Sequence, residues 1–118
     1  MTRVFALLFA AAIVCASESA RAEGTAKQFL ELDAGDDGVA LAEAKISSQE
    51  EGIRVVNAAL PTGSKLYCQP ATLVLTGTQL ADMVRRAVTA DEKLEDTAMS
   101  SVLLGVLEKT FPCVSSAH

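Results

Sequence analysis

Chemistry in this chain could come from three cysteines, one histidine and several pairs of adjacent carboxylates. Cys68 and Cys113 could form a disulfide, remain free thiols, or join a histidine as ligands of a zinc ion. The histidine, His118, is the last residue, and two cysteines with one terminal histidine fall short of the four ligands of a structural zinc site. We therefore predict a disulfide between Cys68 and Cys113, and no metal site. Closing a loop of about 45 residues would stabilise a small domain by about 4 kcal/mol.

The carboxylate pairs are the remaining candidates for general acid–base catalysis. They are Asp36-Asp37, Glu50-Glu51, Asp91-Glu92 and Glu95-Asp96. Residues adjacent in a helix point about 100 degrees apart and do not face each other, so these pairs are more typical of a solvated surface. A nucleophilic side chain would need a nearby base, and the chain's one histidine is terminal. We expect no catalytic residue, no cofactor-binding residue and no cofactor, and hence no enzyme activity.

The first 22 residues have the order of an export signal. Arg3 gives a basic start, residues 4–16 form a continuous apolar run, and Ala20-Arg21-Ala22 offers a small-x-small cleavage site. The apolar run is too short to remain as a membrane-spanning helix. The alternative, lipid attachment at Cys15, fits poorly because the residues before this cysteine do not match the lipoprotein pattern. We predict a cleaved signal peptide (1–22), one domain (23–118), a periplasmic location, and no membrane association after cleavage.

The composition limits the kinds of partner. The chain has 15 Asp and Glu residues against 10 Lys and Arg residues, a net charge of −5, and no cluster of basic residues. It has no Trp and one Tyr, so it lacks the aromatic side chains on which nucleic-acid bases usually stack. We therefore expect no nucleic-acid partner. The partners still expected are another protein or a second copy of this chain in a homodimer.

The spacing of apolar residues predicts four helices and no strands. A short first helix spans Thr25 to Leu32, and a long second helix spans Gly38 to Leu60. Within the second helix Gly52 marks either close approach by another helix or a surface position. Its buried face is expected to comprise Val39, Ala42, Ile46, Ile53, Val56 and Leu60.

The second pair of helices follows a connection that begins at Pro61. Thr76 and Gln79 fit a capping box that opens the third helix, which ends near Ala90. On this helix Asp82 and Arg86, four residues apart, are expected to pair. The fourth helix is expected from Leu94 to Thr110. Its predicted buried face consists of Leu94, Ala98, Val102, Leu103, Val106 and Leu107. The predicted fold is therefore all-α, a small four-helix domain in which one disulfide closes the last helical hairpin.

Three segments together resemble the Rap/Tai family of immunity proteins. They are Leu66-Tyr67-Cys68-Gln69-Pro70, Thr76-Gly77-Thr78-Gln79-Leu80 at the start of a helix, and Phe111-Pro112-Cys113 after the last helix. The resemblance implies a small periplasmic helical protein that neutralises a peptidoglycan amidase effector delivered by type VI secretion. Family members commonly have a second cysteine pair; here the matching stretch, residues 46–52, keeps only its final glycine.

Inhibition by such a protein would come from occlusion of the partner's active site rather than from chemistry. The turns available for this are residues 60–65 and 89–93, and Asp91 and Glu92 in the second turn could meet a basic rim around an amidase site. The other reading of both turns is that they are ordinary connections. A different class of function, an acid-stress chaperone, would use the many carboxylates to open the fold at low pH.

Overall fold

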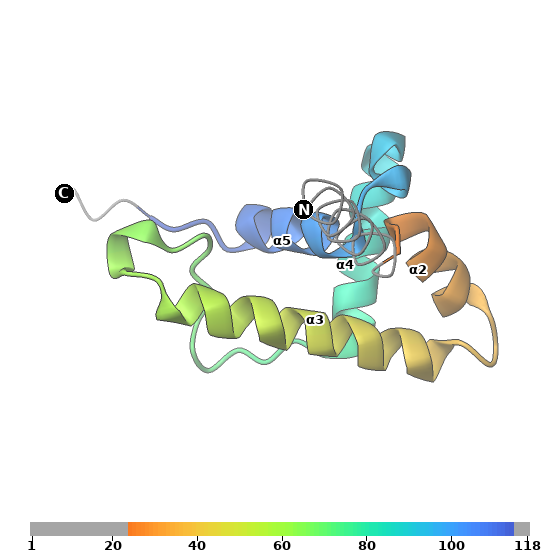
Figure 1. Ribbon diagram of the computed structural model, residues 1–118, viewed down its shortest axis with the longest axis horizontal. Helices are drawn as coiled ribbons and strands as arrows, with labels where there is room; N and C mark the ends of the chain where they lie inside the picture. Colours follow the sequence, from red (N-terminus) through yellow and green to blue (C-terminus); the bar gives the residue numbers. More distant parts are fainter. Residues whose placement is uncertain (1–23, 115–118) are drawn as a thin grey trace, which may run out of the picture.

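The computed structural model describes residues 24–114 and is all-α in this range, which confirms the predicted fold class. The predicted signal peptide, Cys15 and His118 lie outside the described residues. The helices, shown in Figure 1, are α2 (Ala26–Ala34), α3 (Val39–Ala59), the 3-10 helix η1 (Thr62–Ser64), α4 (Gly77–Ala90), the 3-10 helix η2 (Glu92–Asp96) and α5 (Met99–Thr110). The described residues form no strand, and their one β-bridge joins Thr25 to Ala98.

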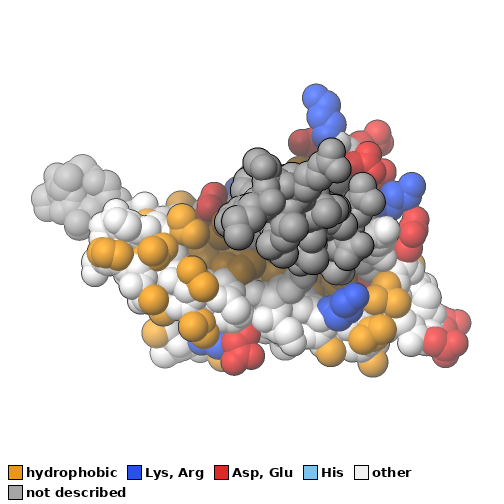
Figure 2. All heavy atoms as spheres, viewed as in Figure 1, with side chains coloured by type: hydrophobic (Ala, Val, Ile, Leu, Met, Phe, Trp, Pro, Cys, Tyr) orange, Lys and Arg blue, Asp and Glu red, His pale blue; other side chains and the backbone are white. Residues whose placement is uncertain are grey.

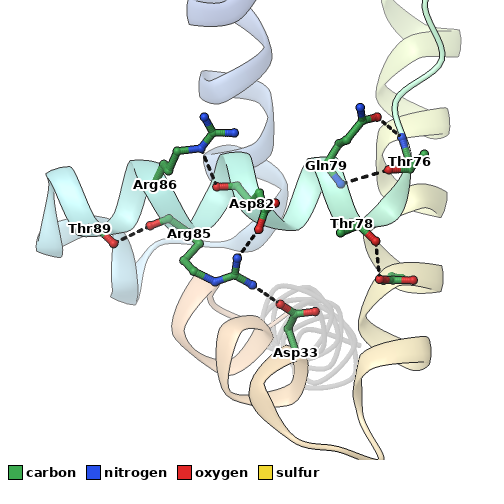
Figure 3. Close-up of polar contacts among 9 residues, drawn as sticks. Asp33, Thr76, Thr78, Gln79, Asp82, Arg85, Arg86 and Thr89 are labelled. Carbon is green, nitrogen blue, oxygen red and sulfur yellow. Dashed lines mark hydrogen bonds and ion pairs between the residues drawn. The ribbon is translucent and has the colours of Figure 1, made fainter.

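Capping side chains fix where α2 and α4 begin. The Thr76 hydroxyl accepts a hydrogen bond from the Gln79 N–H (3.2 Å), and the Gln79 side-chain oxygen accepts one from the Thr76 N–H (2.9 Å). Thr25 and Gln28 form the same arrangement at α2. A capping box satisfies two N–H groups that a helix start would otherwise leave without partners. The predicted capping box of α4 is confirmed, and Figure 3 shows it at the start of this helix.

The expected fourth helix is split in two. Asp91 accepts a hydrogen bond from the Lys93 N–H (3.2 Å) and begins η2, and α5 starts only at Met99. Between them the backbone is extended, because Ala26 N–H donates to the Thr97 carbonyl (3.0 Å) and Met99 N–H donates to Gly24 (3.1 Å). The prediction of one helix from Leu94 was wrong because this pairing with the start of α2 takes the place of a helical turn.

One core joins the four helices. Its buried apolar side chains are Ala26, Phe29, Ala42, Ile46, Tyr67, Leu80, Ala81, Val84, Val88, Met99, Val102, Leu103 and Leu107. On α5 the predicted Val102, Leu103 and Leu107 are buried, while Leu94, Ala98 and Val106 are half-buried and Met99, which was not predicted, is in the core. On α3, Val56 is 62% exposed while Glu50 and Asn57 are buried. Val39 and Val56 were wrongly expected in the core. Val39 is the first residue of α3 and is 37% exposed, and the C-terminal end of α3 extends beyond α5 (Figure 1).

Two glycines permit close approach of backbone segments. A Cβ at Gly77 would lie 2.8 Å from the Glu43 Cβ, so glycine lets the start of α4 pack on α3. A Cβ at Gly38 would lie 2.2 Å from the Leu32 carbonyl oxygen, so glycine is needed in the turn between α2 and α3. A Cβ at Gly52 would have no neighbour within 4 Å, and Gly52 is exposed. Of the two alternatives for Gly52, the surface position is therefore the correct one.

Polar contacts tie α4 to both preceding helices, as Figure 3 shows. The Arg85 guanidinium pairs with Asp82 on its own helix and with Asp33 at the end of α2. The Thr78 hydroxyl donates to Glu43 of α3 (2.7 Å). The predicted pairing of Asp82 with Arg86 was wrong. The Asp82 carboxylate pairs with Arg85, which also reaches Asp33, while the Arg86 side chain donates to the Asp82 backbone carbonyl (3.3 Å).

The molecule therefore has two parts. The packed half comprises α2, α4, η2, α5 and residues 39–49 of α3. The disulfide-bonded end comprises residues 50–75 and 111–114, on the left in Figure 1. Among the described residues, no helix combines the length and the apolar character needed to cross a bilayer.

Candidate functional site

The predicted disulfide is present between Cys68 and Cys113, with Sγ atoms 2.01 Å apart and Cα atoms 4.9 Å apart. It joins the connection before α4 to the segment after α5. Beside it the Cys68 N–H donates to the Phe111 carbonyl (2.8 Å). The two segments are thus linked by one covalent bond and one backbone hydrogen bond.

Lys65 closes the C-terminal end of α3. Its ammonium group donates to the carbonyls of Asn57 (3.0 Å), Ala58 (3.0 Å) and Leu60 (2.9 Å). The last carbonyls of a helix have no partner within the helix, and a cation is favoured at this negative end of the helix dipole. One side chain therefore satisfies three backbone acceptors and holds the 60–65 turn against α3.

Asn57 joins α3 to the cysteine segment. Its amide oxygen accepts a hydrogen bond from the Leu66 N–H (2.7 Å), and its amide nitrogen donates to the Tyr67 carbonyl (2.8 Å). Asn57 is buried, and these two bonds use both ends of its amide group. The position of Tyr67 is therefore set by a buried side chain of the long helix.

Between α3 and the connection lies a pocket of about 590 Å³. The wall from α3 comprises Glu50, Arg54, Asn57 and Ala58. The opposite wall comes from residues 62–75 and is largely apolar around Pro70 and the stretch from Leu73 to Leu75. This volume is within the range of pockets that bind small ligands or single side chains.

An ion pair and a tyrosine give the pocket its electrostatic character. Glu50 is 8% exposed, and its Oε1 lies 3.7 Å from the Arg54 Nε. Burial raises the pKa of Glu50; the Arg54 charge opposes this shift and the Glu51 charge adds to it. Burial also raises the pKa of Tyr67, and the Glu50 charge raises it further. The Tyr67 hydroxyl is therefore protonated at neutral pH and can donate a hydrogen bond.

Two buried polar atoms of the pocket residues have no hydrogen-bond partner in the described part of the chain. They are the Tyr67 hydroxyl oxygen and the Gln69 Oε1. The Gln69 amide nitrogen donates to the Leu73 carbonyl (2.8 Å), so the orientation of this amide is fixed and its oxygen is left as an acceptor. Buried polar groups are normally hydrogen-bonded, so these two atoms mark the pocket as unusual.

Apolar side chains are also exposed on the disulfide-bonded end, and two of them, Leu73 and Val74, line the pocket. On the disulfide-bonded end the exposed large apolar residues are Val55, Val56, Leu66, Leu73, Val74 and Val114. Figure 2 shows hydrophobic side chains gathered at this end of the molecule, over the end of α3 and the connection. Scattered apolar side chains are ordinary on a protein surface, whereas a group of them is typical of an interaction surface.

The predicted partner-binding residues lie elsewhere. Asp91 and Glu92 are exposed in the turn between α4 and η2, at the top of the view in Figure 1 and away from the disulfide-bonded end. Asp91 caps η2 through the Lys93 N–H, so it has a structural role. The other predicted turn, residues 60–65, lies on the disulfide-bonded end, and its Thr62 and Lys65 line the pocket. The structure therefore separates the two turns.

The residues that line the pocket were not predicted as a site. Glu50 and Asn57 lie on the face of α3 that also includes Ala42 and Ile46, so polar residues within an apolar stripe were the available signal. Tyr67 and Gln69 come from an irregular connection, and their approach to α3 depends on tertiary structure. Within residues 24–114 no group of three potential metal ligands is present.

Comparison of the chain with protein-family models, with curated proteins and with solved structures finds no match. The resemblance to the Rap/Tai immunity proteins therefore stays a prediction from the sequence segments given above.

Proposed function

We propose that this chain is an exported, non-enzymatic protein that binds another protein and blocks its active site. The resemblance to the Rap/Tai family supports a peptidoglycan amidase effector as the partner. The location would be the periplasm, where a disulfide such as Cys68–Cys113 persists.

The exposed apolar group on the disulfide-bonded end is the observation that carries this proposal. Val56 and Val74 are 62% and 82% exposed, yet the segments that bear them are fixed by the disulfide, by Lys65 and by Asn57. A surface that is already ordered loses little conformational entropy on binding, so its apolar area contributes to affinity more fully. We therefore place the contact surface here, together with the 60–65 turn, rather than at Asp91 and Glu92.

A titration with purified amidases tests the proposal. The oxidised protein is added to each of a panel of peptidoglycan amidases, and hydrolysis of peptidoglycan is followed as loss of turbidity. We expect one amidase to lose activity in proportion to the protein added, ending at a fixed stoichiometry. Absence of both inhibition and binding across the panel would remove the amidase as the partner class.

Matched variants locate the contact surface. Val56→Asp should weaken inhibition at least tenfold, because it places a charge in an apolar contact. Leu41→Asp is the control, since Leu41 is similarly exposed (56%) on the same helix but in the packed half. Asp91→Ala with Glu92→Ala tests the acidic turn. Loss of inhibition only in this last variant would move the contact surface to that turn.

The pKa shift of Glu50 does not favour an acid-stress chaperone. Acid opening is driven by carboxyl groups whose pKa is lowered in the folded state, because protonating them favours unfolding. The pKa of Glu50 is raised, so its protonation favours the folded state. Suppression of client aggregation at pH 3, absent at pH 7, is the measurement that would support this second function. Sedimentation of the protein alone shows whether it forms a homodimer, and so distinguishes dimer formation from both functions.

A further inference from the structure

The pocket next to the disulfide has a chemical specificity of its own, beyond the exposed surface assigned to a partner. Two of its polar residues are already engaged in the fold: Lys65 donates to three carbonyls, and both ends of the Asn57 amide are hydrogen-bonded. The buried polar atoms of the described pocket residues that lack a partner are the hydroxyl of Tyr67, a residue that is 1% exposed, and the Oε1 of Gln69.

One of these two groups is a hydrogen-bond acceptor and the other can act as a donor. Gln69 Oε1 is an acceptor, as every amide oxygen is, and the bond from the nitrogen of the same amide to the Leu73 carbonyl fixes its orientation. The Tyr67 hydroxyl can donate. A ligand that satisfies both must offer one donor and one acceptor, and an amide group carries both, in its N–H and its C=O.

The charge and shape of the pocket further limit the class of ligand that it can bind. Arg54 and Glu50 form an ion pair at the pocket, so their charges oppose each other and leave no strong net attraction for an ion. A charged ligand would lose its hydration without gaining an unpaired counter-charge. The apolar wall formed by Pro70 and residues 73–75 suits an aliphatic group.

We propose that this pocket binds an uncharged peptide amide that bears an aliphatic side chain, such as an internal leucine residue. Such a group could come from a free blocked peptide or from an exposed loop of a protein. Both unpartnered atoms are shielded from solvent, so the ligand reaches them through a small shift of the irregular 69–75 connection. This site can be tested separately from amidase inhibition, because it is defined by Tyr67 and Gln69 rather than by Val56.

Nuclear magnetic resonance titration of the oxidised, ¹⁵N-labelled protein tests the site. The probes are N-acetyl-leucine amide, the capped tripeptide acetyl-Leu-Val-Leu-amide, and the same tripeptide sequence displayed in a loop of a carrier protein. N-acetyl-leucine, which has a carboxylate in place of the amide, is the charged comparison. We expect saturable shifts confined to the amides of Tyr67, Gln69 and residues 73–75, with at least tenfold weaker binding of the carboxylate.

Variants connect these shifts to the two unpartnered atoms. Tyr67→Phe should weaken binding of the capped tripeptide about fivefold, because one buried hydrogen bond is lost. It should not lower the unfolding temperature, because the hydroxyl has no partner to lose among the described residues. Gln69→Leu should weaken binding similarly, and Gln49→Leu, on α3 outside the pocket, is its control.

Each outcome decides the proposal. Binding of the free peptides assigns the ligand as free peptide, and binding of the displayed tripeptide alone assigns it as a protein loop; either supports the site. Three results would overturn it: no binding of any amide probe, shifts that map outside the pocket, or unchanged affinity in both Tyr67→Phe and Gln69→Leu. Inhibition of an amidase that persists in Tyr67→Phe would leave the proposed function intact while this site fails.

Discussion

The packed half and the disulfide-bonded end are held together by different forces. Within residues 24–114, all but one of the buried apolar side chains belong to the packed half, and the exception is Tyr67. The disulfide-bonded end is instead fixed by the Cys68–Cys113 bond and by the side chains of Lys65 and Asn57. The packed half gains stability mainly by removing apolar surface from water, and the other end buries less apolar surface and has covalent and polar links in addition.

This difference shows how a small domain can keep apolar side chains on its surface. If Val56 and Val74 were needed to order the end of α3 and the connection by apolar packing, they would be buried and could not contact a partner. Covalent and polar links leave them exposed and still fixed in position. The predictions below test whether the two regions depend on these separate forces.

Removing the disulfide should have the largest effect. Replacing Cys68 and Cys113 together by Ser opens a loop with a sequence separation of 45 residues. We expect the free energy of unfolding to fall by about 4 kcal/mol, mainly because the unfolded chain gains entropy. Urea denaturation followed by circular dichroism measures this. Amide hydrogen exchange should accelerate most in residues 60–75, and equal acceleration in α4 would contradict the separation into two regions.

Truncating a side chain of the core should have the next largest effect. Leu103 is fully buried, and Leu103→Ala should lower the free energy of unfolding by about 3 kcal/mol through lost burial and the cavity left behind. Val56→Ala, at the disulfide-bonded end, is the comparison and should change the free energy of unfolding by less than about 0.5 kcal/mol. The same urea denaturation serves for both variants. Similar losses in the two would show that apolar packing also orders the disulfide-bonded end.

The sequence was informative wherever structure depends on nearby residues. The capping box of Thr76 and Gln79 and the span of α3 follow from patterns within a few residues, and the structure confirms both. The cysteine pairing was predictable because only one pair remains after the predicted signal. Each of these features is settled by local chemistry or by elimination.

The features that were missed depend on tertiary structure. The break before Met99 comes from pairing of the chain with Ala26 and Gly24, far earlier in the sequence. Val56 has the spacing of a buried residue, but α3 extends past the core at this point. The pocket was missed for the same reason, since Tyr67 approaches Glu50 and Arg54 only once the connection folds back on α3.

The Asn57 contacts offer a smaller and more specific test. Asn57→Ala removes the partners of the Leu66 N–H and the Tyr67 carbonyl at once. We expect a loss of about 2 kcal/mol, because backbone groups at a buried position are left unsatisfied. Ser48→Ala, an exposed polar truncation on the same helix, should cost less than about 0.5 kcal/mol. A loss at Asn57 no greater than at Ser48 would mean that the disulfide and Lys65 order this end without the Asn57 contacts.

The smallest expected effect concerns the charge of Glu50. Its pKa in the folded state is raised from the ordinary value of 4.5 by burial, so the folded protein binds this proton more tightly than the unfolded chain does. The ionised group therefore destabilises the fold at neutral pH. This penalty disappears as the pH falls through the raised pKa to below 4.5.

Glu50→Gln should accordingly raise the free energy of unfolding at pH 7 and leave it nearly unchanged below pH 4.5. Glu108→Gln, the same substitution at an exposed position on α5, is the matched control. Urea denaturation across this pH range measures the difference between each variant and the parent chain. A Glu50→Gln variant that is less stable at pH 7 would mean that the ion pair with Arg54 outweighs the burial of the carboxylate. The disulfide-bonded end would then be held by charge as well as by hydrogen bonds and its covalent link.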